Sequence, residues 1–238
     1  VGIGMEETSE RVRSDTLFSA WISAYARLFG KDAVEDLLSQ FYSKHNSPLR
    51  VSSTFIYQHR EKSTIYYLPR PLSFPKGYPI GNDLAFTKTY KKLNYIPLSV
   101  WKRWYQEEGI TNKDCEELIA YTNGERHNQN LEQAGIFDYS KTYQSSTIPK
   151  VALDRKTTAS NFYQTGFVQF QANAGLYFLV NLASDNQKLE QELKASLYLL
   201  GEEGLGGERS SGAGRFTPHW SNLSSEWEKL IKFNQNSH

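Results

Sequence analysis

Residues 201–216 read GEEGLGGERSSGAGRF, and this glycine-rich stretch is the strongest local pattern in the chain. It follows a segment whose leucines recur at helical spacing, so a helix is expected to lead into it. Glycines lose much backbone entropy on ordering, and their concentration indicates close backbone approach to a ligand or positive φ angles. Bare N–H groups beside arginines suit phosphate oxygens. The residues that carry this pattern are Gly201, Gly204, Gly206, Gly207, Arg209, Gly212, Gly214 and Arg215.

Two familiar nucleotide-binding loops are excluded for this stretch. No Gly-Lys-Ser/Thr follows the glycines, as a phosphate-binding loop of nucleoside triphosphatases requires. A dinucleotide fingerprint follows a strand, whereas this stretch follows an expected helix. A flexible surface connection remains the alternative to an anion-binding loop.

Composition bounds the remaining possibilities. The 238 residues can form one large domain or two small ones, and a formal net charge of +1 gives no general sign of nucleic-acid binding. Any bound RNA must therefore be held at a local site. Cys115 is the single cysteine, which excludes an intramolecular disulfide and a cysteine zinc cluster. No apolar run approaches the roughly 20 residues of a membrane span, and a soluble intracellular protein is expected.

The first part of the chain predicts helices and strands in alternation. Apolar residues at helical spacing follow Ser14, and Gly30 stands where a helix would end before a second one begins at Asp32. Further on, the pattern predicts a hairpin of residues 51–57 and 64–68, a strand at 93–98, helices at 99–109 and 113–121, and a mobile polar insertion at 122–146.

The second part predicts two strands, 162–170 and 176–182, that meet at a turn over residues 172–175. A helix from Ser184 or Asp185 to Leu200 is ended by Gly201, and the tail predicts a final helix. Both halves fit the ferredoxin-like order of strands and helices, the first without its opening strand. The expected fold class is α+β, with ferredoxin-like domains at 1–146 and 147–238.

Other residues could also hold an anion or do chemistry. Arg13 and Ser14 stand at a helix N-terminus, which attracts anions, although helix capping alone explains Ser14. Arg155 lies in the basic, hydroxyl-rich run 154–158, where a solvated turn is equally expected. No two histidines have the spacing of zinc ligands. A metal-free ribonuclease could still use one histidine together with a tyrosine or lysine as general acid and base.

Four motifs in order, SDTLFSA at 14–20, LDR at 153–155, GLYFLV at 175–180 and the glycine-rich stretch, resemble a known family. This family is the fourth Csm subunit of type III-A CRISPR complexes, in the RAMP superfamily. The resemblance implies two ferredoxin-like, RRM-like domains and no nuclease activity, cofactor or metal. It also implies that the chain holds the repeat-derived 5′ handle of crRNA and joins the large polymerase-like signature subunit to the backbone RAMP subunits. The expected compartment is the prokaryotic cytoplasm.

The resemblance also implies which residues contact RNA. One alternative is the equivalent capping subunit of a III-B or III-D complex. Another is a RAMP endoribonuclease that processes CRISPR precursor RNA. This enzyme needs a histidine in the first helical region or next to the glycine-rich stretch, and residues 1–44 contain none. The expected RNA-binding residues are Arg13, Ser14, Arg155, Gly204, Gly206, Gly207, Arg209, Gly212, Gly214 and Arg215.

Overall fold

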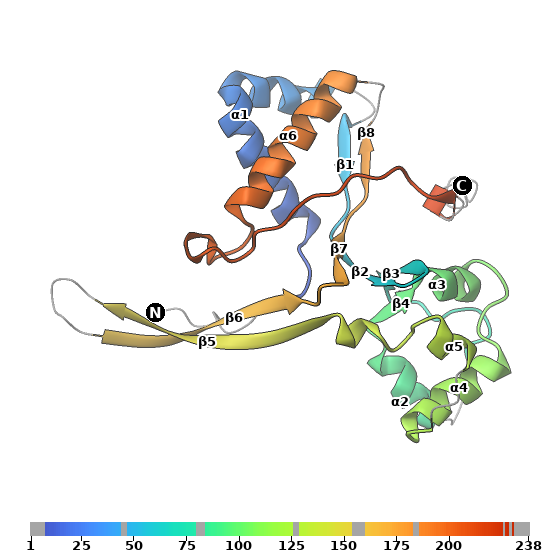
Figure 1. The fold of residues 1–238 in the computed structure, drawn as a ribbon. Helices are drawn as coiled ribbons and strands as arrows, with labels where there is room; N and C mark the ends of the chain where they lie inside the picture. The colour runs from blue at the N-terminus through green and yellow to red at the C-terminus, as the bar shows by residue number, and fades with distance from the viewer. Residues whose placement is uncertain are drawn as a thin grey trace. The chain divides into compact units, whose positions relative to one another are not determined.

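The computed structural model describes residues 8–43, 47–79, 84–125, 129–153, 160–182, 186–225, 227–228 and 230. The chain divides into two compact units (Figure 1). Unit 1 comprises residues 1–11 and 55–177, and unit 2 comprises residues 12–54 and 178–238. The predicted domains 1–146 and 147–238 do not coincide with these units. The reason is that segments from both ends of the chain pair with each other, so each unit is discontinuous in sequence.

The described part of unit 2 includes the helices α1 and α6 and a short two-stranded sheet. Helix α1 (Ser14–Ser43) is broken at Gly30, whose φ of 85° and ψ of 175° are not helical. The prediction of two helices separated by this glycine is therefore confirmed. Strand β1 (Leu49–Val51) pairs antiparallel with β8 (Val180–Leu182). Helix α6 (Gln187–Glu203) packs against α1.

The core of unit 2 is the contact between the apolar faces of α1 and α6. Trp21 is fully buried, and its Nε1 donates to the Leu193 carbonyl oxygen and to Ser196 Oγ, both at 2.9 Å. The predicted leucine face of α6 is confirmed, because Leu189, Leu193, Leu197 and Leu200 are all buried here. The predicted end of this helix is wrong by about one turn. Gly201 lies buried inside α6, and the C-cap is Gly204.

Unit 1 contains a four-stranded sheet in the order β4-β3-β2-β7. Strands β2 (Phe55–Arg60) and β3 (Ser63–Pro69) form the predicted hairpin, with a tighter turn than expected, because both strands extend into residues 58–63. Strands β4 (Tyr95–Pro97) and β7 (Ala174–Tyr177) complete the sheet. One face of it buries Ile56 and Tyr67.

The pairing expected in the second half of the chain is wrong. Strand β6 (Ser160–Phe170) pairs with β5 (Tyr143–Leu153) along eleven residues, as the long two-stranded ladder of Figure 1 shows. Residues 172–175 therefore do not join a hairpin of 162–170 and 176–182. Strand β7 pairs instead with β2, and the predicted strand 176–182 is divided between β7 and β8. The β2–β7 and β1–β8 ladders join segments that are distant in the chain, and such pairings leave no local signal in the sequence.

The helical part of unit 1 packs around a separate core. The predicted strand at 93–98 and the helices at 99–109 and 113–121 are confirmed, with revised bounds. The predicted mobile insertion at 122–146 is wrong for its described residues, because Leu131, Ile136 and Tyr139 are buried. None of the described helices has the length and apolarity that crossing a membrane requires. The elements are α2 (Leu84–Lys92), α3 (Leu98–Tyr105), α4 (Asn112–Thr122), α5 (Asn130–Gln133) and the 3₁₀ helix η1 (Tyr139–Lys141).

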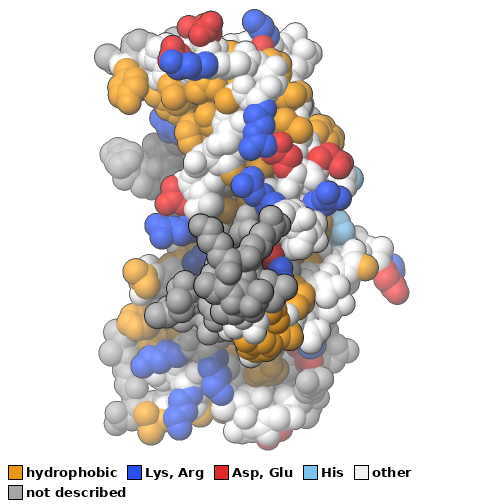
Figure 2. Space-filling view, turned by 90° about the vertical axis from the view of Figure 1, so that its left-hand side faces the viewer, with side chains coloured by type: hydrophobic (Ala, Val, Ile, Leu, Met, Phe, Trp, Pro, Cys, Tyr) orange, Lys and Arg blue, Asp and Glu red, His pale blue; other side chains and the backbone are white. Residues whose placement is uncertain are grey.

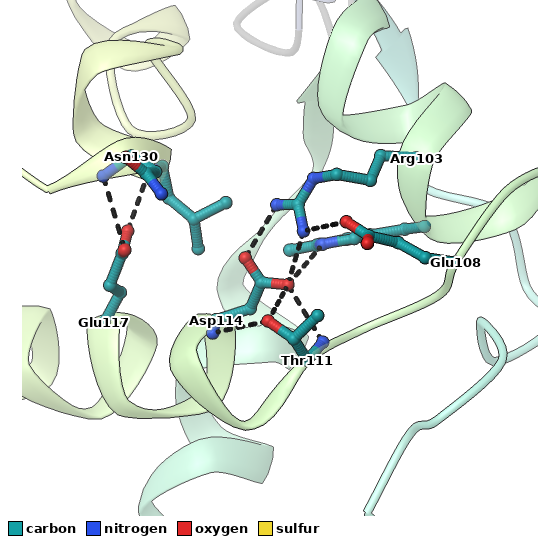
Figure 3. A network of polar contacts seen from close by, with 8 residues as sticks. Arg103, Glu108, Thr111, Asp114, Glu117 and Asn130 are labelled. Atoms are coloured by element: carbon teal, nitrogen blue, oxygen red, sulfur yellow. Dashed lines mark hydrogen bonds and ion pairs between the residues drawn. The ribbon is translucent and has the colours of Figure 1, made fainter.

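A buried polar network ties these helices together (Figure 3). Arg103 of α3 donates to both carboxylate oxygens of Asp114, at 2.7 and 2.6 Å, and Thr111 forms a capping box with Asp114 at the start of α4. Burial alone would raise the pKa of Asp114, but the hydrogen bonds from Arg103 and Thr111 outweigh it and hold that pKa below its ordinary value. Glu117 accepts from the backbone N–H groups of Asn130 and Leu131, so α4 also fixes α5.

Candidate functional site

The glycine-rich stretch and the first turns of α1 line one open groove in unit 2, with a volume of about 660 Å³. These two segments are about 180 residues apart in sequence and are brought together by the packing of α1 on α6. The lining residues are Asp15, Thr16, Ser19, Ala20, Ser23, Arg27, Leu200, Glu203, Gly204, Leu205, Gly206 and Arg209.

The α1 wall of the groove is a polar stripe. Ser19, Ser23 and Arg27 recur every four residues and therefore share one face of the helix. The opposite face carries Leu17 and Trp21, which are buried. Because this apolar face packs into the core, the polar stripe on the other side of the helix faces the groove. The stripe offers hydroxyl groups to a ligand in the groove, whereas its guanidinium, that of Arg27, pairs with Glu203.

The charges at the start of α1 are paired with one another. The backbone N–H of Thr16 donates to the Asp15 carboxylate at 2.7 Å, and this contact lowers the pKa of Asp15. Arg13 lies 3.7 Å from the same carboxylate, and both side chains are exposed to solvent. A pair of this kind is weak. Arg13 can therefore exchange Asp15 for an anionic ligand at little cost.

Three glycines of the glycine-rich stretch are required by the path of the backbone itself. A Cβ on Gly214 would lie 2.0 Å from the Leu205 carbonyl oxygen, and one on Gly204 would lie 2.6 Å from that of Ala213. Both residues also have positive φ angles, of 75° and 84°. Gly201 is equally confined by the Phe216 carbonyl oxygen, at 2.3 Å. The stretch is therefore a closed turn, held by the Leu205 N–H to Gly214 oxygen bond of 2.9 Å.

The other three glycines have free space around them. No atom lies within 4 Å of a Cβ built on Gly206, Gly207 or Gly212. Gly206 and Gly212 have positive φ angles, which favour glycine. Gly207 has neither a positive φ nor a close neighbour, so the fold makes no demand for glycine there. Close approach of a ligand to this backbone is a physical reason for a glycine at this position.

We expect Gly207→Ala and Gly214→Ala to have opposite effects on the fold. Gly207→Ala should leave the melting temperature unchanged, whereas Gly214→Ala should destabilise unit 2 by about 1–3 kcal/mol, because its Cβ meets the Leu205 backbone at a strained φ. Thermal denaturation followed by circular dichroism measures both. Equal melting temperatures for the two variants would contradict the assignment of Gly214 as a glycine required by the turn.

Two arginines of the stretch present their charge to solvent. Arg209 and Arg215 are exposed, and within the described part of the chain neither side chain forms an ion pair. Arg27 is different, because it pairs with Glu203 across the groove. One acidic residue of the stretch, Glu203, is therefore the ion-pair partner of an arginine. In the described segments no group of three or more His, Cys, Asp or Glu residues is placed to hold a metal ion.

The predicted site residues fall into three groups. Gly204, Gly206 and Arg209 line the groove, and the remaining predicted residues of the stretch belong to the same closed turn. Arg13 and Ser14 directly precede the lining residue Asp15. Arg155 lies outside the described residues. Sequence reasoning missed the polar stripe of α1, although its four-residue spacing was visible in the helix that begins at Ser14.

Comparison with solved structures defines the class of fold. The crystal structure of a Csm3–Csm4 subcomplex of the type III-A CRISPR-Cas interference complex matches with a TM-score of 0.57 and 19% identity, covering 98% of this chain and 72% of that chain. The protein thus has an α+β fold similar to that of a chain of this subcomplex. A Csm1–Csm4 cassette matches at a TM-score of 0.47, over 80% of this chain, which is too low to support an argument.

Sequence comparison also finds similarity to Csm4 proteins. The chain is 27% identical to the Csm4 protein of Methanocaldococcus jannaschii over 242 residues, covering 89% of this chain and 60% of the relative. It is 28% identical over 211 residues to Csm4 of Thermococcus onnurineus, covering 86% and 61%. The predicted resemblance to Csm4 is confirmed. The chain spans about three fifths of the length of these curated relatives, and no family model matches it.

Proposed function

We propose that this chain is a non-catalytic crRNA-binding subunit of a type III-A CRISPR interference complex and holds the repeat-derived 5′ handle in the groove of unit 2. The observation that carries the proposal is the meeting of the glycine-rich stretch with the polar stripe of α1. Each wall offers groups that bind a sugar-phosphate backbone, and the similarity to Csm4 supports crRNA as the ligand.

The chemistry of the two walls suits an RNA backbone bound by shape. The exposed guanidinium groups of Arg209 and Arg215 suit phosphate oxygens. The hydroxyls of Thr16, Ser19 and Ser23 can contact phosphates and 2′-hydroxyls, and the start of α1 adds a partial positive charge. Contacts of this kind position RNA without reading its sequence. The near-neutral net charge suits a subunit that shares its RNA with neighbouring subunits.

The proposal includes the architecture and partners that the resemblance implies. Two ferredoxin-like domains would join the large polymerase-like signature subunit to the backbone RAMP subunits in the prokaryotic cytoplasm. The solved relative with a similar fold was crystallised as a Csm3–Csm4 subcomplex, which supports the backbone side of this junction. Arg155, which follows strand β5 in the sequence, is included as a further RNA contact.

The double variant Arg209→Ala/Arg215→Ala should weaken crRNA retention by the assembled complex. Removing one phosphate contact should reduce the slope of log affinity against log salt by about 0.7 for a single strand. Filter binding over a salt series measures both quantities. The matched control is Arg11→Ala/Arg50→Ala, which removes the same charge from exposed residues outside the groove. Equal losses in the two double variants would mean that only net charge matters.

The RNA that co-purifies with the assembled complex identifies the ligand. Sequencing should recover crRNA with a protected repeat-derived 5′ tag, and its absence would contradict the proposed function. The large subunit that co-purifies separates a III-A complex from the equivalent III-B or III-D complex. Incubating the purified chain with labelled repeat RNA tests the endoribonuclease alternative. Metal-independent cleavage that co-purifies with this chain would show that the chain is an endoribonuclease.

A further inference from the structure

The positive charge of the chain is concentrated in one segment. Residues 69–105 contain seven Lys and Arg residues but only one Asp or Glu, in a chain whose formal net charge is +1. The remaining residues are therefore acidic overall. This segment belongs to unit 1 and contributes nothing to the groove of unit 2. Two of the seven, Lys102 and Arg103, pair with acidic residues just beyond the segment. The other five, Arg70, Lys76 and the lysines of α2, form no ion pair within the described residues, and their charge creates a local positive field that attracts polyanions.

Helix α2 presents much of this charge on one exposed face. Phe86 and Tyr90 point into the core, whereas Lys88, Lys91 and Lys92 are exposed. In the described part of the chain these lysines form no ion pair, and no acidic residue lies in the helix. Figure 2 shows Lys and Arg side chains gathered among hydrophobic ones in its lower part, where α2 lies. The helix dipole accounts for lysines in the last turn but not for Lys88 at mid-helix.

An exposed aromatic ring adjoins the basic helix. The Phe74 ring lies 4.2 Å from the Tyr78 ring and 6.3 Å from the Tyr90 ring of α2, measured between centroids, yet Phe74 is 61% exposed. The Arg70 guanidinium lies 5.2 Å from the centroid of the same Tyr90 ring. Its Nε donates to the Leu93 carbonyl oxygen just beyond α2, at 2.8 Å. Phe74 and Arg70 are therefore held against Tyr90 and the C-terminal end of α2, the helix that carries the lysines.

We propose that Phe74, Arg70 and the lysines of α2 form a second binding surface, for single-stranded nucleic acid. Cationic side chains along a path contact successive phosphates, and an exposed, supported aromatic ring stacks on a base; this combination is typical of single-strand binding without sequence preference. An acidic protein surface would match the charge but would not use the stacked ring. A duplex would match the charge but hides its bases from Phe74. The surface is independent of the handle-binding groove, and the inference does not rest on the proposed function.

The test measures binding of a short fluorescein-labelled oligouridine to the full chain by fluorescence anisotropy. The glycine-rich stretch is first disabled with Arg209→Ala/Arg215→Ala, so that the groove does not contribute. In that background Lys88→Gln/Lys91→Gln/Lys92→Gln should reduce the slope of log affinity against log salt by about 2. This value assumes that each lysine contacts one phosphate and that each contact contributes roughly 0.7 to the slope. Phe74→Ala should weaken binding about tenfold, the loss expected for one stacked base. Phe74→Tyr should restore binding, because it keeps the ring.

The controls decide between a specific surface and net charge alone. Lys62→Gln/Lys113→Gln/Lys141→Gln removes the same charge from other exposed lysines of unit 1 and should leave the binding nearly unchanged. Ultraviolet crosslinking of bromouridine-labelled RNA should mark the peptide that contains Phe74 and Tyr78. The proposal is overturned if the control triple variant loses as much affinity, if Phe74→Ala binds normally, or if duplex RNA or phosphatidylserine vesicles bind while oligouridine does not.

Discussion

Replacing Asp114 by alanine should destabilise unit 1 by about 3–5 kcal/mol, the cost typical of removing one partner from a buried ion pair. The side chain of Asp114 is 4% exposed and accepts from Arg103 and from Trp104 Nε1. Its loss would leave the half-buried Arg103 guanidinium without its main partner and α4 without its capping box. Urea denaturation followed by tryptophan fluorescence measures the change, since Trp101 and Trp104 report on this core.

Two comparisons test the cause of this destabilisation. Glu108 is the other partner of Arg103, and the Glu108 side chain is 57% exposed. Glu108→Gln should therefore lower the free energy of unfolding by less than about 1 kcal/mol. Because the folded-state pKa of Asp114 is lowered, its stabilising effect is complete above the unfolded pKa of about 3.9 and disappears as pH falls through the folded pKa. The stabilities of the wild type and Asp114→Asn should therefore converge in acid. A constant difference down to low pH would show that the charge is not responsible.

The sequence predicted elements whose signal is local. The helices at Ser14, Lys113 and Leu189 have apolar residues at helical spacing and buried faces, and these helices are present. Strand pairing was predicted correctly only for β2 and β3, which are neighbours in the chain. The partners of β7 and β8 lie far away in the sequence, and a strand pattern does not encode its partner. Strands β5 and β6 are consecutive in the chain, and their pairing was missed because residues 143–146 were assigned to the polar insertion.

Two segments of unit 1 escaped sequence reasoning for different physical reasons. Helix α2 contains threonines and lysines, and its apolar signal is limited to a few residues such as Phe86 and Tyr90. Residues 122–146 are mostly polar, and their order comes from isolated anchors such as Leu131 and from the backbone hydrogen bonds to Glu117. In both segments tertiary contacts outweigh weak local propensity.

The candidate site was predicted in part for the same reason. A cluster of glycines and arginines is visible without a structure, so one wall of the groove could be named. The other wall depends on the docking of α1 against α6, which no local pattern specifies. The structure also separates the glycines by role, because only the surroundings of Gly214 and Gly207 show that one is required by the turn and the other is not.

The docking of α1 on α6 leads to the second large expected effect. Trp21→Ala should destabilise unit 2 by about 3–5 kcal/mol, because it leaves a cavity in the core. It also removes the indole hydrogen bonds to Leu193 and Ser196 and the edge-on contact with Phe178, at 5.8 Å between ring centroids. Differential scanning calorimetry measures this loss directly.

The same variant tests whether the groove depends on this packing. RNA retention by Trp21→Ala should fall although Trp21 does not line the groove, since the polar stripe would no longer be held against the glycine-rich stretch. Trp21→Phe should keep most of the packing and lose only the two indole hydrogen bonds, at a cost of about 1–3 kcal/mol. The matched control is Phe29→Ala, at a partly exposed position of the same helix, which should change little. Normal RNA retention by a destabilised Trp21→Ala would show that the ligand is held without the α1 wall.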